Sequence, residues 1–225
     1  KGSTIKRFVE NLMPAHASVV ALGIPSDSEA KYWFRRYERY FPKAGSMAFF
    51  DRSWYSRALI EPTMGYCSKT RYKYFMKNVL RWEHNHIERG LLLVKFYLSI
   101  DRETQLFRFG SRLSDPLTYW KFSENDLYAR EKWTIFTQYK EQMFNHTSSK
   151  ISPWVVISAN KKREARLTAM LHLVRLYGPS SYEPLTGEEV KEEYSMRLGG
   201  IKFRNLSLQQ MAVLKSLRDS DKTSN

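Results

Sequence analysis

Four short, mostly apolar runs, set between segments of helical periodicity, constrain most strongly what this chain can fold into. The runs cover residues 17–22, 47–50, 91–98 and 154–159. Runs of this length are typical of strands buried on both faces, and strands that alternate with helices form parallel sheets. The sequence therefore predicts an α/β fold of three layers, with helices on both faces of a parallel sheet. Ligands are expected at the carboxyl ends of its strands.

Helical segments lie between these runs. Apolar residues recur at the spacing of one helix face from residue 5 to residue 12. Ser26 and Glu29 form a capping-box pattern at the start of a second helix, which is expected to end at Pro42. Further helices are predicted over residues 72–90 and 167–177.

A polar helical insertion, about residues 102–146, separates the third and fourth strands. It is longer than a simple crossover connection needs, so it is a candidate lid. The sequence predicts one core domain over residues 1–177. Residues 178–225, with an amphipathic stretch at 206–217, are expected to form a helical peripheral arm.

The net charge of +14 bears on partners and not on the fold. An anionic partner is expected, and charge alone leaves nucleic acid, an anionic membrane and a phosphate-rich substrate open. The single cysteine, Cys67, cannot form an intramolecular disulfide, and no apolar stretch approaches the roughly 20 residues of a membrane helix. We therefore expect a cytoplasmic protein that does not bind membranes.

The first helix begins directly after Lys1, where free backbone N–H groups and the helix dipole attract phosphate. A lysine in this place is typical of the end of a Walker A loop, although Gly2 stands where Ser or Thr normally follows. The alternative is a basic first turn that is merely solvated. The Walker A interpretation predicts a glycine-rich loop immediately before Lys1.

Asp51 directly follows the second apolar run. A carboxylate there fits a Walker B aspartate that holds Mg²⁺ beside phosphates, whereas a helix cap is the common alternative. The neighbouring Arg52 and Arg57 favour the phosphate site, because guanidinium groups bind phosphate in a bidentate manner. In the insertion, Arg108 and Arg112 share a helix face, an arrangement that an anion between them would stabilise.

Several motifs follow one another in a fixed order along the chain. They are FDRSWY at 50–55, the arginines of 108–112, DPL at 115–117, WK at 120–121 and ANKKR at 159–163. Together they resemble the polyphosphate kinase 2 family from residue 1 to about residue 176. The resemblance implies a P-loop kinase core like that of thymidylate kinases, with a helical lid and a Mg²⁺-dependent, reversible transfer of phosphate between inorganic polyphosphate and a nucleotide.

Carried over residue by residue, the resemblance implies that Lys1 is the Walker A lysine and Asp51 the Walker B aspartate and metal ligand. Arg108 and Arg112 match the lid arginines, and Arg52 is expected to neutralise charge with them. A second metal-binding aspartate would lie before Lys1, and a dimer or tetramer is implied. Phosphate or polyphosphate binding is assigned to Gly2, Ser3, Thr4, Lys6, Arg7, Arg57, Lys69 and Lys121.

A polyanion explains the net charge of +14 better than a mononucleotide does, and the expected acceptors are ADP and GDP. Ser56 matches neither the Asn of many diphosphate-specific members nor the acidic residue of many monophosphate-specific ones, so a polyphosphate:AMP phosphotransferase stays open. An ATP-dependent thymidylate-like kinase would leave the breadth of the basic surface unexplained. A non-catalytic nucleic-acid-binding protein is disfavoured, because the acidic Asp51 among the cations would repel a phosphate backbone.

Overall fold

The computed structural model describes residues 1–177, 196–198 and 201–203. The chain forms two compact units, Lys1–Met170 and Leu171–Asn225. The boundary lies inside α9 (Lys162–Tyr177).

The described part of the second unit contains a short antiparallel hairpin, formed by β5 (Met196–Leu198) and β6 (Ile201–Phe203). These residues are strands, whereas a helical arm was expected. The predicted amphipathic stretch at 206–217 lies outside the described residues.

The four predicted strands are confirmed as β1 (Ala17–Val20), β2 (Met47–Phe50), β3 (Lys95–Ser99) and β4 (Trp154–Ser158). Each is shorter than or equal to its apolar run. The strands pair in parallel, β1 with β2 and β3 with β4. The mixed fold with parallel strands is therefore confirmed, but within the described residues the strands form two small sheets instead of one.

Phe8 connects the two sheets. Its ring stacks on Phe49 of β2, with the ring centroids 5.4 Å apart, and on Phe96 of β3 at 5.9 Å. An apolar run shows that a strand is buried but carries no information about its hydrogen-bonded neighbour, so the division into two sheets was not visible in the sequence.

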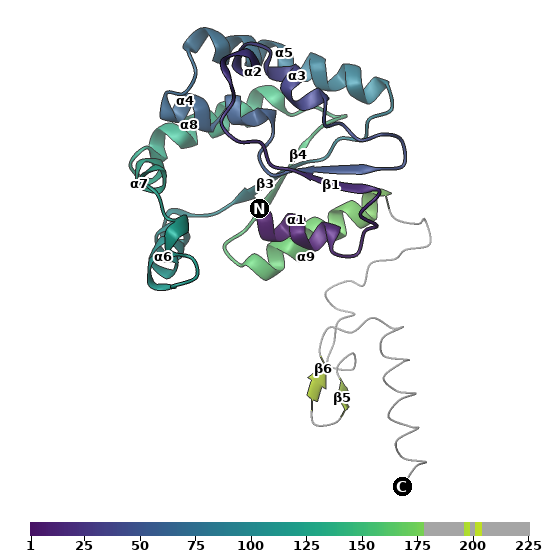
Figure 1. Cartoon of the computed structure of the whole chain (residues 1–225), viewed down its shortest axis with the longest axis vertical. Coiled ribbons are helices and arrows are strands. Elements are labelled where there is room, and N and C mark those ends of the chain that lie inside the picture. The colour runs from purple at the N-terminus through teal and green to yellow at the C-terminus, as the bar shows by residue number, and fades with distance from the viewer. Residues whose placement is uncertain (178–195, 199–200, 204–225) are drawn as a thin grey trace. The chain divides into compact units, whose positions relative to one another are not determined.

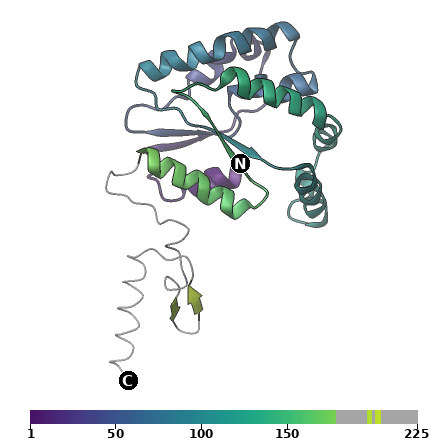
Figure 2. The ribbon, with the colours of Figure 1, turned by 180° about the vertical axis from the view of Figure 1, so that it is seen from behind.

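Helices lie on both sides of the strands. In Figure 1, α1 (Gly2–Val9) and the first part of α9 (Lys162–Tyr177) lie on one side, and Figure 2 shows the same pair from behind. Figure 1 shows the second group of helices on the opposite side. This group comprises α2 (Asp27–Lys31), α3 (Trp33–Glu38), α4 (Ile60–Met64), α5 (Lys69–Glu88) and α8 (Trp133–Thr147).

The capping box at the start of α2 is confirmed. Ser26 Oγ accepts from the Glu29 N–H, and the Glu29 carboxylate accepts from the Ser26 N–H. The second predicted helix is divided, however, because Tyr32 leaves the helical conformation at φ −104° and ψ 55°. The insertion folds as α6 (Arg102–Ser114), η2 (Tyr119–Lys121) and α7 (Glu124–Glu131), followed by α8.

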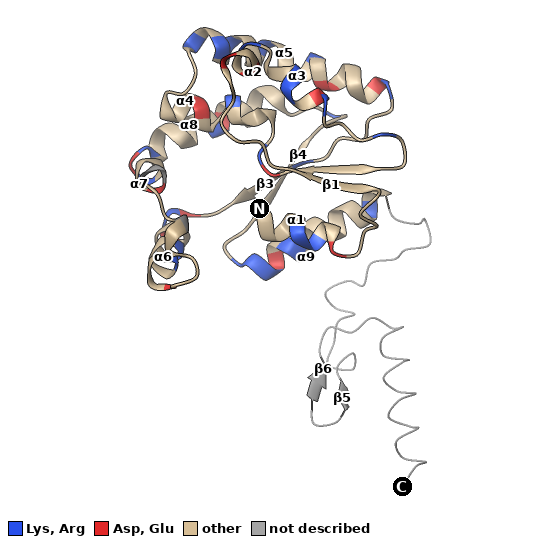
Figure 3. Ribbon diagram, in the orientation of Figure 1, with Lys and Arg blue, Asp and Glu red and all other residues tan. Residues whose placement is uncertain are grey.

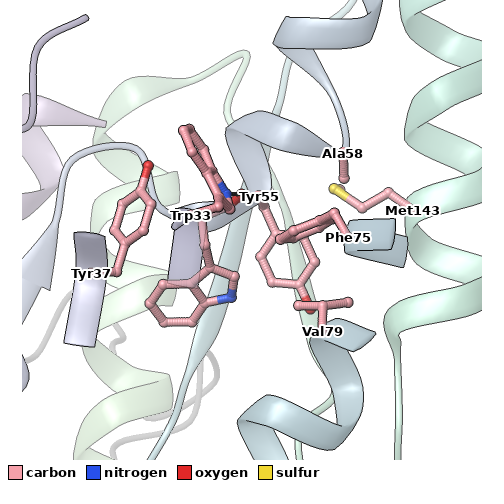
Figure 4. Packing of buried hydrophobic residues seen from close by; sticks show 8 residues of the cluster. Trp33, Tyr37, Tyr55, Ala58, Phe75, Val79 and Met143 are labelled. Carbon is pink, nitrogen blue, oxygen red and sulfur yellow. Dashed lines mark hydrogen bonds between the residues drawn. The ribbon is translucent and has the colours of Figure 1, made fainter. Parts of the chain in front are cut away.

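An aromatic core packs between the strands and the larger helix group (Figure 4). Trp33 and Tyr37 of α3 meet edge to face with centroids 5.4 Å apart, and the Trp33 indole donates to the Trp54 carbonyl at 2.9 Å. The short helix η1 (Trp54–Arg57) follows β2 directly. Its burial fixes the segment that leaves the carboxyl end of β2.

A buried ion pair lies at the opposite, amino end of β3. Lys95 Nζ donates to Glu83 Oε2 at 2.9 Å and to the Thr147 carbonyl at 2.7 Å. The Trp54 indole donates to the other Glu83 oxygen at 2.9 Å. This network joins β3 to α5, α8 and η1. No helix in the described part of the chain has the length and apolarity needed to cross a bilayer.

Candidate active site

The structure brings Lys1 and Asp51 into direct contact at the carboxyl ends of the strands. Parallel pairing continues one residue past the strands, where the Asp51 N–H donates to the Val20 carbonyl at 2.8 Å. Lys1 Nζ lies 2.5 Å from Asp51 Oδ1, although fifty positions separate the two residues. Two candidates that the sequence placed in different motifs thus form one ion pair.

The start of α1 lies against the same carboxylate. A Cβ on Gly2 would lie 3.4 Å from Asp51 Oδ2, which is van der Waals contact, so the first residue of α1 lies directly beside the carboxylate. Lys1 precedes the helix as its N-cap residue without a side-chain cap, which leaves its amine for Asp51. Of the other candidates here, Ser3 and Lys6 are exposed, Thr4 is buried, and Arg7 pairs with Glu10.

Arg52 has a strained backbone beside this ion pair. Its φ is 70°, and among the described residues it is the one non-glycine with positive φ. Its side chain is exposed, whereas Trp54 and Tyr55 after it are buried. Strain of this kind collects at functional sites and persists where neighbouring packing holds it.

Arg57 does not lie with these residues. Its side chain is 4% exposed and pairs with Glu61, and its guanidinium stacks over the Trp33 ring at 3.9 Å. Arg57 was predicted to bind phosphate, but the turn of η1 directs it inward to these partners. Glu61 at position i+4 was the signal that pointed to this alternative.

Arg108 reaches the neighbouring sheet. One of its terminal nitrogens donates to the Ala159 carbonyl at 2.5 Å and to the Asn160 carbonyl at 3.0 Å. Arg112, one turn later, pairs with Asp126 at 3.2 Å. The two arginines of α6 therefore have different partners, one at the strand ends and one inside the insertion.

The last two phosphate-binding candidates lie on other elements. Lys69 is exposed at the first residue of α5, and Lys121 ends η2, with its side chain outside the described part.

Sequence reasoning missed two features of this edge. Asp101 and Asn160 form a hydrogen-bonded pair beyond the ends of β3 and β4. In the loop after β1, Ile24 is 96% exposed, while the buried Arg36 holds the Gly23 carbonyl at 2.6 Å. Asp101 follows its apolar run as Asp51 follows another, and this parallel was the available signal.

The protein ligands for a metal are few. The described residues contain no group of three or more His, Cys, Asp or Glu side chains placed to hold a metal ion. Mg²⁺ bound with phosphates needs only one or two protein carboxylates, because waters and phosphate oxygens supply the other ligands. The half-buried carboxylate of Asp51 fits Mg²⁺ on this condition, that is, together with substrate phosphates.

Comparison with known proteins identifies the family that the chain matches. The model of the family described as "Polyphosphate kinase 2 (PPK2)" matches residues 1–180. A GDP-polyphosphate phosphotransferase of Pseudomonas aeruginosa is 46% identical over 175 residues, which cover 77% of this chain and 49% of that protein. Polyphosphate kinase PPK2B of Corynebacterium glutamicum is 41% identical over 191 residues, which cover 84% of this chain and 62% of that protein.

A solved structure agrees with these relatives. The crystal structure of polyphosphate kinase 2 from Arthrobacter aurescens superposes with a TM-score of 0.70 at 29% identity, covering 82% of this chain and 68% of that one. The chain spans about half the length of the first relative and less than two thirds of the second. Because the family model covers most of the chain, this protein belongs to the polyphosphate kinase 2 family.

Proposed function

We propose that this chain carries the phosphotransferase core of an enzyme that moves phosphate reversibly between inorganic polyphosphate and a nucleoside diphosphate, ADP or GDP. The observation that carries the proposal is the Lys1–Asp51 pair at the start of α1. It joins a cation at a helix N-terminus, where phosphate binds, to a carboxylate suited to Mg²⁺. The names of the two relatives support polyphosphate and GDP as substrates.

Phosphoryl transfer needs positioning and charge neutralisation more than covalent chemistry from the protein. In the proposed site, Lys1 leaves Asp51 for a substrate phosphate, and the N–H groups of Gly2 and Ser3 face the same phosphates, whereas the Thr4 N–H donates to the Lys1 carbonyl at 2.8 Å. Asp51, so released, is the residue that would hold Mg²⁺. When bound, the ion would neutralise charge on the transferring phosphates.

We propose residues 102–146 as a lid on a three-layer P-loop kinase core. The helices on both sides of the strands support the layers, and the contact of Arg108 with the β4–α9 loop supports the lid. In this arrangement Arg52 neutralises charge on the transferring phosphates from the carboxyl end of β2. Arg108 and Arg112 neutralise it from the lid. Arg112 would exchange Asp126 for phosphate, which binds a guanidinium more strongly because it carries more charge.

Polyphosphate would extend beyond the metal site over exposed cations. Lys and Arg gather on α1 and at the start of α9 (Figure 3), and Lys6 and Lys162 are exposed there. A chain of phosphates has about one charge for each phosphate, so it meets many more cations than a nucleotide does.

The test incubates the full-length protein with long-chain polyphosphate, Mg²⁺ and each of AMP, ADP, GMP and GDP, and follows nucleotides by chromatography. We expect ADP and GDP to become triphosphates, and Lys1→Ala to lower this rate on the order of 100-fold. Lys150→Ala is the control, because Lys150 is exposed and lies before the amino end of β4, whereas the proposed site lies at the carboxyl ends of the strands. If no nucleotide gains phosphate from polyphosphate while ATP phosphorylates a monophosphate, the thymidylate-like alternative is correct. Conversion of AMP alone would favour the AMP phosphotransferase.

A further inference from the structure

A side-chain pair fastens the start of α6 to the loop after β4. The Asn160 amide donates to Asp101 Oδ2 at 2.5 Å, and its oxygen accepts from the Asp101 N–H at 3.1 Å. The other Asp101 oxygen accepts from the Thr104 N–H at 2.6 Å and caps α6. Asp101 thus serves as the N-cap of α6 and as the partner of Asn160 at once.

Chemistry fixes the orientation of this pair. A carboxylate only accepts and a backbone N–H only donates, so the Asn160 amide satisfies both in one orientation alone. The hydrogen bond from Thr104 lowers the pKa of the Asp101 carboxyl, with a smaller contribution from Asn160. The parallel register of β3 and β4, in which Ser99 lies opposite Ser158, brings the two residues together.

Arg108 makes a second contact between the same two segments. Its guanidinium is held by the carbonyls of Ala159 and of Asn160 itself. These carbonyls are neutral and phosphate is charged, so phosphate competes well for the guanidinium. The position of the Arg108 guanidinium relative to a bound phosphate therefore depends on where Asn160 holds the β4–α9 loop against α6.

We propose that Asn160 is a positioning residue for phosphoryl transfer, which acts through Asp101 and Arg108 by fixing the β4–α9 loop against the start of the lid helix. The inference rests on the proposed function, because it assigns Arg108 to the transferring phosphates. Displacement of a catalytic group by about 1 Å can lower the rate by up to roughly 100-fold. A shift of Arg108 caused by loss of the Asn160–Asp101 pair should therefore be measurable in kcat.

The first experiment changes the amide of the pair to a carboxylate in the full-length protein. Asn160→Asp places two carboxylates face to face, and we expect kcat for polyphosphate-dependent phosphorylation of ADP to fall about 10- to 100-fold. Binding of ADP, measured by calorimetry, should stay within about twofold of wild type, since in this proposal the pair acts through Arg108 on the transferring phosphate.

The exchange variant with Asp101→Asn and Asn160→Asp restores the pair in reverse and should recover most of kcat. The amide introduced at position 101 still accepts from the Thr104 N–H through its oxygen, and its NH₂ group donates to the new carboxylate at position 160. Asn85→Asp, which adds the same charge on the exposed face of α5, is the matched control and should be fully active. If Asn160→Asp does not fold, Asn160→Ala removes both hydrogen bonds without repulsion and replaces it.

A double-mutant cycle then tests the route through Arg108. In an Arg108→Ala background, Asn160→Asp should lower kcat by less than about twofold, because the guanidinium through which Asn160 acts is already absent. An equal loss in both backgrounds, or wild-type kcat in Asn160→Asp, would overturn the proposal.

Hydrogen exchange of the backbone amides in the first turn of α6 tests the pairing independently of enzymatic activity. It should accelerate in Asn160→Asp and return to the wild-type rate in the exchange variant, and unchanged exchange would also contradict the pairing. Lack of polyphosphate-dependent turnover in the wild type would instead refute the proposed function, so the two failures are distinguishable.

Discussion

Arg52 combines an exposed guanidinium with a backbone conformation that arginine rarely adopts. The left-handed region costs a residue with a Cβ roughly 1–2 kcal/mol, and glycine avoids this cost. The buried Trp54 and Tyr55 hold the segment in place. The molecule therefore retains a residue that lowers its stability at the point where the proposed phosphates bind.

Two substitutions separate the guanidinium from the strain. Arg52→Gly and Arg52→Ala both remove the guanidinium, and each should lower kcat on the order of 100-fold. Only glycine relieves the backbone, so Arg52→Gly should exceed Arg52→Ala in free energy of unfolding by about 1 kcal/mol, measured by urea denaturation. Equal stabilities would show that the backbone relaxes when the side chain is shortened.

Individual site residues were predictable where a motif placed them at a strand end or helix start. Lys1 and Asp51 were predicted together, and their contact follows from these two positions. The Asn160–Asp101 pair was not predicted, because only the folded chain brings these two residues together. Arg57 was predicted to bind phosphate, and its burial beside Glu61 was indicated only by their spacing of four positions. A charged residue in a motif indicates chemistry, but its partner decides whether that charge is free.

At the scale of whole elements, the Lys95–Glu83 pair contrasts with the ion pair of the candidate active site. Both charges are almost fully buried, with 3% and 0% of their side chains exposed. Burial lowers the pKa of Lys95, and the charge of Glu83 opposes this effect. Removing one partner of such a pair leaves the other charge buried without compensation.

Lys95→Met should therefore lower the free energy of unfolding by about 3–5 kcal/mol, measured by urea denaturation. The exposed Lys150→Met should change it by less than about 0.5 kcal/mol. The rate per folded molecule should remain near wild type, because Lys95 lies at the amino end of β3 and the site at the carboxyl ends. A loss below about 1 kcal/mol would mean that Trp54 and Ser152 satisfy Glu83 without Lys95.

Elements were predicted better than their connections. All four strands of the first unit and the capping box of α2 followed from periodicity and local chemistry. The break at Tyr32 and the division into two sheets did not, since both depend on tertiary packing, which overrides local preference. The aromatic core explains the break, because Trp33 and Tyr37 are buried just after it.

At the scale of the whole molecule, the net charge of +14 predicts how the substrates respond to salt. Long polyphosphate would meet exposed cations outside the proposed Mg²⁺ site, so its apparent KM should rise steeply as salt increases from low to physiological concentration. The KM of ADP, and that of tripolyphosphate as a short-chain control, should rise less. Equal salt dependence of long and short chains would show that the outer cations take no part.

Phe8 couples the position of α1 to the positions of both sheets. Its ring lies against Phe49 on one sheet and Phe96 on the other, and it belongs to the same short helix that begins after Lys1. Any movement of one sheet relative to the other would therefore move α1 as well, and with it the Lys1 side chain that contacts Asp51.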